Sequence, residues 1–181
     1  MQQKFFLPLG LVVIVIGVAV AMGFLGSPPT PEPTVTIANF TECAAAGYPI
    51  MESYPRQCRA SNGQVFQEDI GNILDKSDLI RVTTLAPNDV VKSPLTVAGE
   101  ARGNWYFEAS FPVILKDGQG NEVTKGIAQA QSDWMTTNFV PFTVTLTFTP
   151  PVSTTGTLDL KKANPSGLPQ NDDELIIPIQ F

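Results

Sequence analysis

The stretch Ala101–Leu115, ARGNWYFEASFPVIL, decides the fold class of this chain. Its apolar side chains fall on odd positions: Trp105, Phe107, Ala109, Phe111, Val113 and Leu115. A β-strand sends alternate side chains to one face, so this spacing predicts a strand whose odd-numbered side chains lie in a core. Tyr106 falls on the even, outward side, where it is either a contact residue or an ordinary outward-facing strand tyrosine.

The same spacing recurs along the C-terminal part of the chain. Apolar residues alternate at 142–148 and 175–181 and, over shorter lengths, at 80–82, 95–97 and 158–160. Residues 122–131 form a less regular strand, in which Gly126 is expected to make a β-bulge. Turn-forming residues separate these segments, and no helix is expected between them. The pattern predicts an all-β domain at 78–181, an antiparallel β-sandwich of two sheets packed face to face.

The N-terminal residues 1–25 have the character of a membrane-spanning segment. Phe5–Leu25 is uncharged and almost wholly apolar, and as a helix it would span about 31 Å, close to the hydrocarbon thickness of a bilayer. Lys4 precedes it and the next basic residue is Arg56, so the positive-inside rule predicts a single-pass anchor with the rest of the chain exported. A cleaved signal peptide, with its site at Ala19–Ala21, is the alternative and predicts secretion.

Residues 26–36, GSPPTPEPTVT, are rich in proline, which favours an extended linker over a packed element. A small module is expected at 37–70. In it, a short helix capped by Asn39 or Thr41 ends near Gly47, and two short extended pieces are followed by a hairpin turn at 61–64.

Both cysteines of the chain, Cys43 and Cys58, lie in this module. An exported chain with two cysteines favours one disulfide bond between them, worth about 3 kcal/mol by closing a loop of this length. The alternative is a redox-active or metal-binding pair, but the spacing is not C-x-x-C and the chain has no histidine. We therefore interpret the pair as structural.

Composition excludes several functions. The chain has 11 Lys+Arg against 17 Asp+Glu, a net charge of -6 that repels a polyphosphate backbone, so nucleic acid is not an expected partner. The absence of histidine excludes Ser-His-Asp and Cys-His nucleophile systems and imidazole metal sites. No glycine-rich phosphate loop or nucleophile-elbow motif is present. We expect no enzyme activity, no cofactor and no metal.

Four segments of the C-terminal domain carry a family resemblance: SPLTVAGEAR (93–102), WYFEASFPV (105–113), SDWM (132–135) and NPSGLP (164–169). With the rest of the chain from about residue 79 to 181, they resemble the Gmad2 family, immunoglobulin-like domains first recognised in bacterial sporulation and germination proteins. The resemblance implies an immunoglobulin-like β-sandwich of bacterial type. It also implies a non-catalytic, extracytoplasmic domain that binds protein or cell-wall components.

Two places are candidates for partner binding. Trp134 and Met135 lie where the alternation is interrupted, so they either cap one end of the sandwich or project as a recognition anchor. The loop 163–174 is the other candidate, because binding residues of sandwiches concentrate in end loops. Its residues Asn171, Asp172 and Asp173 are either part of a solvated loop or oxygen ligands for a cation such as calcium, and we assign no metal.

The sequence therefore predicts a membrane-anchored protein that displays an immunoglobulin-like binding or adhesion domain in the bacterial cell envelope. Its expected partner is an envelope protein or a cell-wall component. One alternative is an accessory or inhibitor of an envelope enzyme, presented through the cystine module. The other is a structural spacer.

Overall fold

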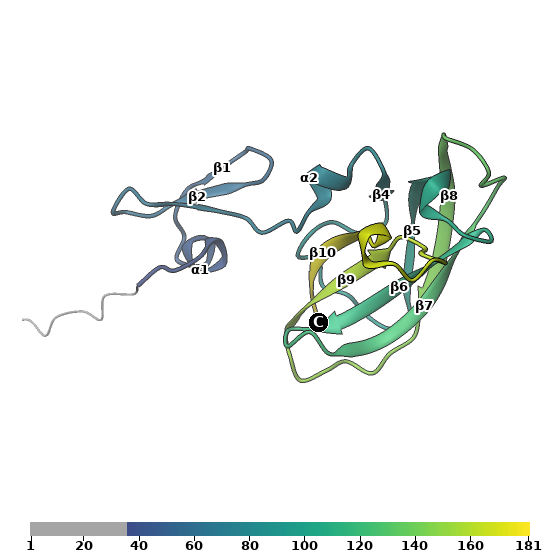
Figure 1. Cartoon of the computed structure of the whole chain (residues 1–181). Coiled ribbons are helices and arrows are strands. Elements are labelled where there is room, and N and C mark those ends of the chain that lie inside the picture. The colour runs from purple at the N-terminus through teal and green to yellow at the C-terminus, as the bar shows by residue number, and fades with distance from the viewer. Residues whose placement is uncertain (1–35) are drawn as a thin grey trace, which may run out of the picture. The chain divides into compact units, whose positions relative to one another are not determined.

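The computed structural model describes residues 36–181 (Figure 1). The predicted membrane anchor at 1–25 and almost all of the proline-rich linker at 26–36 lie outside these residues. Within the described part, no helix combines the length and the apolar character needed to cross a membrane.

Residues 37–70, which we call the cystine module, contain helix α1 (Phe40–Ala45) and strands β1 (Ile50–Met51), β2 (Gln57–Arg59) and β3 (Val65–Gln67). The side chain of Asn39 accepts a hydrogen bond from the backbone N–H of Glu42 at 2.8 Å, which caps the helix as predicted. The strands form one antiparallel sheet in the order β1-β2-β3. The predicted disulfide between Cys43 and Cys58 is confirmed.

The core of the cystine module is small: Cys43, Cys58, Ala60 and Phe66 form its buried cluster. An ion pair lies beside it, in which Arg56 Nε donates to Glu68 Oε2 at 2.8 Å. The Arg56 guanidinium holds the pKa of the Glu68 carboxyl below its ordinary value, although burial of Glu68 acts in the opposite direction. Asn88 donates to the same carboxyl at 3.3 Å and so connects the module to the domain that follows.

The C-terminal domain begins with helix α2 (Ile73–Lys76), which the sequence pattern did not predict. Its strands are β4 (Ile80–Val82), β5 (Leu95–Arg102), β6 (Ser110–Asp117), β7 (Glu122–Ala130), β8 (Phe139–Leu146), β9 (Thr155–Lys161) and β10 (Glu174–Gln180), with 3-10 turns η1 (Gly103–Trp105) and η2 (Pro169–Asn171). They pair in the order β10-β9-β6-β7-β8-β5-β4, antiparallel throughout.

The junction between β7 and β8 makes this sheet a sandwich. The two strands pair only at Gln129 with Thr143 and at Ala130 with Phe142, and Figure 1 shows them diverging beyond that point. The sheet therefore folds into a four-stranded layer, β10-β9-β6-β7, and a three-stranded layer, β8-β5-β4. The predicted antiparallel β-sandwich is confirmed.

The interior of the sandwich follows the predicted alternation in most strands. The alternate residues of β8 and β10 that face inward are almost fully buried: Phe142, Val144, Leu146, Leu175, Ile177 and Ile179. Phe111 lies between two other rings, with centroids 5.1 Å from Tyr106 and 5.0 Å from Phe142, both edge to face. Edge-to-face rings at this separation attract one another in addition to burying apolar surface.

The stretch Ala101–Leu115 departs from its prediction, because it is not one strand. β5 ends at Arg102 and β6 begins at Ser110, and the two strands belong to different layers of the sandwich. Glu108 and Ala109 between them have positive φ angles of 51° and 60°, which break the alternation. The odd-position rule therefore holds for Trp105 and Phe111 but is wrong for Phe107, whose side chain is 44% exposed.

The predicted bulge at Gly126 is also wrong. The irregularity lies between Leu115 and Lys116, whereas Gly126 pairs regularly with Val113. A Cβ atom at Gly126 would lie 2.6 Å from Leu146 Cδ2 and 2.8 Å from Val144 Cγ2. Glycine is present here because side chains from the opposite layer pack directly on its backbone.

The outer edge of β10 is closed by two other segments. The side chain of Asn72 acts as a short strand: its Nδ2 donates to Glu174 O at 2.9 Å, and its Oδ1 accepts from Ile176 N at 2.7 Å. Further along, Asn88 N donates to Pro178 O, and residues 89–91 pair in parallel with Gln180. These contacts satisfy edge groups that would otherwise be open to another strand.

Replacing Asn72 with alanine is expected to lower the free energy of unfolding by about 2 kcal/mol, because two part-buried backbone groups of β10 lose their partners. Urea unfolding of the Asn72→Ala variant measures this. Asn171→Ala is a suitable control, since among residues 36–181 the side-chain amide of Asn171 bonds only to Ser166 Oγ, in an exposed loop. Equal losses for the two variants would show that Asn72 does not support the β10 edge.

Candidate functional site

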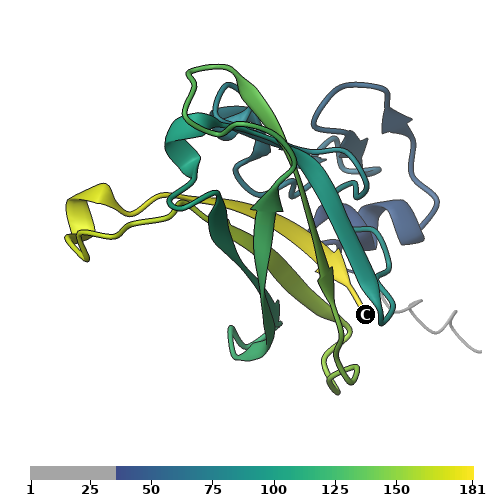
Figure 2. The ribbon, with the colours of Figure 1, turned by 90° about the vertical axis from the view of Figure 1, so that its right-hand side faces the viewer.

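Three connections lie together at one end of the sandwich, which we call the loop end: β5–β6 (103–109), β7–β8 (131–138) and β9–β10 (162–173). The N–H of Ala163 donates to Trp105 O at 2.9 Å, and Arg102 Nη1 donates to Thr137 O at 3.1 Å. A Cβ at Gly103 would lie 2.2 Å from Trp134 O, so the backbones of two of these loops touch there. In Figure 2 the three connections occupy the upper and left parts of the ribbon, and the β6–β7 and β8–β9 connections lie at the bottom.

Tyr106, a predicted candidate for partner binding, is not at the surface. Its side chain is 4% exposed, and its hydroxyl donates to Val140 O at 2.7 Å. Burial raises the pKa of this phenol well above its ordinary value. The prediction that Tyr106 faces outward is wrong because the chain leaves the strand geometry at η1, so the odd and even faces of Ala101–Leu115 are not continuous.

Trp134 and Met135 take different positions. Trp134 is partly buried and packs against the core, so the side chain caps the loop end of the sandwich. Met135 is 76% exposed, and its backbone N–H bonds to Asp133 Oδ1 at 3.0 Å, which fixes the turn that presents it. Of the two alternatives in the sequence, Trp134 is the cap and Met135 is the residue that projects.

Two further apolar side chains at the loop end were not named as candidate residues, although one of them lies in the candidate loop 163–174. Phe107 in the β5–β6 connection is 44% exposed, and Leu168 in the β9–β10 connection is 49% exposed. The alternation placed Phe107 inside, and only the positive φ angles after it reveal otherwise. Leu168 follows Gly167, which has a φ of +64°, and the turn NPSGLP could have marked it as a loop tip. Each of the three loops therefore exposes one large apolar side chain.

The predicted polar candidates Asn171, Asp172 and Asp173 lie in the β9–β10 connection and bond within the domain. Asn171 Nδ2 donates to Ser166 Oγ at 2.9 Å, and Asp172 Oδ1 accepts from Asn164 Nδ2 at 2.7 Å. Asp173 Oδ1 lies 2.5 Å from Lys76 Nζ of α2. These contacts hold the loop in shape and occupy oxygens that a cation would need.

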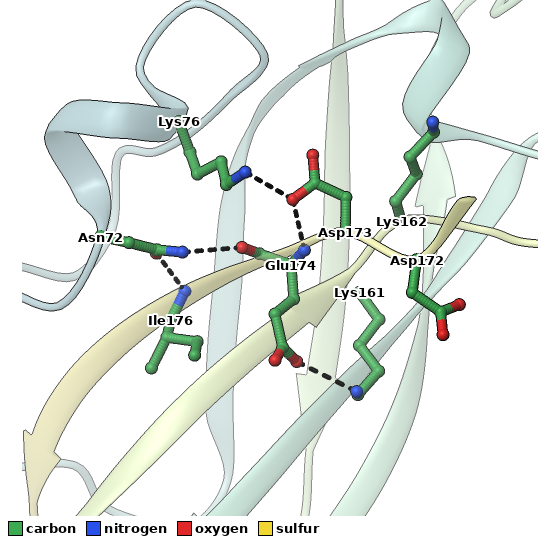
Figure 3. Close-up of a pocket in the computed structure, with 8 residues that line it drawn as sticks. All are labelled: Asn72, Lys76, Lys161, Lys162, Asp172, Asp173, Glu174 and Ile176. Atoms are coloured by element: carbon green, nitrogen blue, oxygen red, sulfur yellow. Dashed lines mark hydrogen bonds and ion pairs between the residues drawn. The ribbon is translucent and has the colours of Figure 1, made fainter. Parts of the chain in front are cut away.

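A recess of about 440 Å³ lies beside this loop (Figure 3). Charged side chains of both signs dominate its lining, which consists of Asn72, Lys76, Lys161, Lys162, Asp172, Asp173, Glu174 and Ile176. Lys161 Nζ lies 3.0 Å from Glu174 Oε2, and Figure 3 shows this pair and the Lys76–Asp173 pair on separate parts of the wall. No group of three histidine, cysteine, aspartate or glutamate side chains in residues 36–181 is arranged to hold a metal ion.

The fold and the arrangement of loops define a class: an immunoglobulin-like, all-antiparallel β-sandwich with three connections gathered at one end. Residues 79–167 match the model of the Gmad2 family, described as the immunoglobulin-like domain of bacterial spore germination. This match lies within the C-terminal domain of the chain. No curated protein and no solved structure gave a significant match to the chain.

Proposed function

We propose that this chain is a membrane-anchored protein of the bacterial cell envelope whose Gmad2 domain binds a partner through the loop end, without catalysis. Domains of this immunoglobulin-like class generally bind and do not catalyse. The apolar segment Phe5–Leu25 supports the anchor, with secretion after cleavage as the alternative. The disulfide supports an extracytoplasmic location, since such bonds persist in oxidising compartments.

One observation carries the binding role: Phe107, Met135 and Leu168, from three separate loops, each expose a large apolar side chain at the same end. Contiguous apolar patches with a polar rim are typical of protein contact surfaces, and loops that meet at one end of a sandwich can bring such side chains together. The recess beside the β9–β10 loop adds paired charges next to one of these three loops. An envelope protein fits this surface better than a neutral glycan, because apolar tips gain most from burial against apolar groups.

Site-specific photo-crosslinking in cells tests the proposal with the full chain. A photoreactive residue at position 135 is expected to give one discrete cross-linked species. The same residue at Val152 is a matched control, since Val152 is fully exposed in the β8–β9 connection at the opposite end. Substituting Phe107 or Leu168 with serine is expected to weaken the cross-link at 135 about tenfold, because each contact contributes about 1–2 kcal/mol. Equal cross-linking from positions 135 and 152 would contradict the assignment.

A second function is favoured by the cystine module, which exposes Ile50, Tyr54 and Val65. These residues could contact an envelope enzyme, as an accessory or inhibitor would. Cross-linking from Tyr54 with no cross-linking from Met135 would favour this alternative. A structural spacer would give discrete species from neither position.

A further inference from the structure

Two arginine side chains share one aromatic ring on the outer face of the three-stranded layer. The guanidinium carbon of Arg102 lies 4.0 Å from the centroid of the Phe139 ring, and that of Arg81 lies 4.4 Å from the same centroid. The three residues come from β5, β8 and β4, respectively. Guanidinium groups stack favourably on aromatic faces, so the ring holds each of the two cations against it.

Backbone carbonyl groups fix the orientation of both side chains. Arg102 Nε donates to Asp78 O at 3.0 Å and its Nη1 to Thr137 O at 3.1 Å, while Arg81 Nε donates to Ser77 O at 2.6 Å. Within residues 36–181 the structure shows no hydrogen bond from the Nη2 atom of either arginine. Each guanidinium therefore keeps a terminal nitrogen for another acceptor while its position is fixed.

Carboxylate groups within 4.0 Å balance only part of the charge of this pair. Glu100 Oε1, 3.5 Å from Arg81 Nη1, is the one carboxylate oxygen within 4.0 Å of either guanidinium in the described part of the chain. Arg102 has no such partner there. Two cations beside one carboxylate leave a local positive excess on a chain whose net charge is -6. An anion that reached both guanidinium groups would offset their mutual repulsion.

We propose that the Arg81–Phe139–Arg102 stack is a binding site for a phosphate group. Each phosphate oxygen can accept a charge-assisted hydrogen bond from a guanidinium group, and the charge of the phosphate matches two cations. The phosphate comes either from a free phosphate compound or from a phosphodiester such as a lipid headgroup. This site does not depend on Phe107, Met135 or Leu168 and goes beyond the proposed partner binding.

The test is a titration of the full chain in a maltoside detergent, which contains no phosphate. The nitrogen-15 resonances of the arginine Nε–H groups report binding. Inorganic pyrophosphate is expected to shift the resonances of Arg81 and Arg102 in a saturable way. Arg59 is an internal control, since it is exposed and has no carboxylate within 4.0 Å in the described residues. Sodium chloride and sodium acetate of equal ionic strength are the solution controls.

Parallel titration with glycerophosphoglycerol distinguishes the two sources of phosphate. Tighter binding of glycerophosphoglycerol than of pyrophosphate identifies a phosphodiester, and the reverse identifies free phosphate.

Arg81→Gln and Arg102→Gln are each expected to weaken the binding measured at the remaining arginine about tenfold, the value of one charge-assisted hydrogen bond. Arg59→Gln should leave it unchanged. Because Arg102 also supports two loops, Arg81→Gln provides the independent variant. A response to acetate as large as that to the phosphates, or no saturable shift beyond the chloride control, would overturn the proposal.

Discussion

Phe111→Ala is expected to lower the free energy of unfolding by about 3–5 kcal/mol, the usual cost of removing a buried phenyl ring. Phe111 is 1% exposed and touches the rings of Tyr106 and Phe142 edge to face. The substitution would leave a cavity between the two layers of the sandwich, at a place where strands from both layers meet. Two aromatic contacts would be lost together with the burial.

Phe107→Ala is the matched control, because it removes the same side chain four residues away. Phe107 is 44% exposed, so its loss is expected to cost less than about 1 kcal/mol. Urea unfolding followed by tryptophan fluorescence measures both variants, since Trp105 and Trp134 both lie in the sandwich. Comparable losses would show that Phe107 is buried, and would remove it from the proposed contact surface.

Removing the disulfide by Cys43→Ala together with Cys58→Ala is expected to destabilise the cystine module by about 3 kcal/mol. This is the usual value for a bond between cysteines 15 residues apart in the sequence. The module has little else to hold it, because the two cysteines are half of the four buried residues that form its core cluster. Short chains with so small a core depend on such a bond. We expect the module to unfold locally while the sandwich stays folded.

Limited proteolysis with trypsin measures local unfolding of the cystine module, because the module contains the cleavage sites Arg56 and Arg59. Cleavage there is expected to increase by about two orders of magnitude, the factor that corresponds to 3 kcal/mol. Tryptophan fluorescence should remain unchanged, because both tryptophans report on the sandwich alone. Simultaneous loss of the native fluorescence would show that the module and the sandwich unfold as one cooperative unit.

The two proposed sites lie close in the fold but differ in chemistry. Arg102 bonds to Thr137 in the connection that also presents Met135, so the phosphate site and the loop end share one structural support. Gly103, whose backbone touches the carbonyl oxygens of Trp134 and Thr136, holds the same region together. A substitution at Gly103 or Arg102 is therefore less informative about partner binding than a substitution at the exposed side chains of the loops.

The candidate site was predicted only in part. The interrupted alternation around Trp134 and Met135 and the polar loop 163–174 indicated two of the three connections at the loop end. The third, 103–109, was hidden inside a stretch whose spacing looks like one strand. As a result Phe107, which was expected inside, is exposed, and Tyr106, which was expected outside, is buried. The residue types Glu108 and Ala109 do not indicate the positive φ angles found there.

The sequence by itself determined the class of the fold, the content of most of its core and the disulfide. Alternation of apolar residues is a local property of a strand, so segments such as 142–148 and 175–181 carry it wherever they pack. The tertiary structure decided where one strand ends and the next begins within Ala101–Leu115, why Gly126 is glycine, and which side chains meet at the loop end. Those features depend on contacts between residues far apart in the chain, such as Trp105 with Ala163 and Arg102 with Thr137, and local spacing contains no information about them.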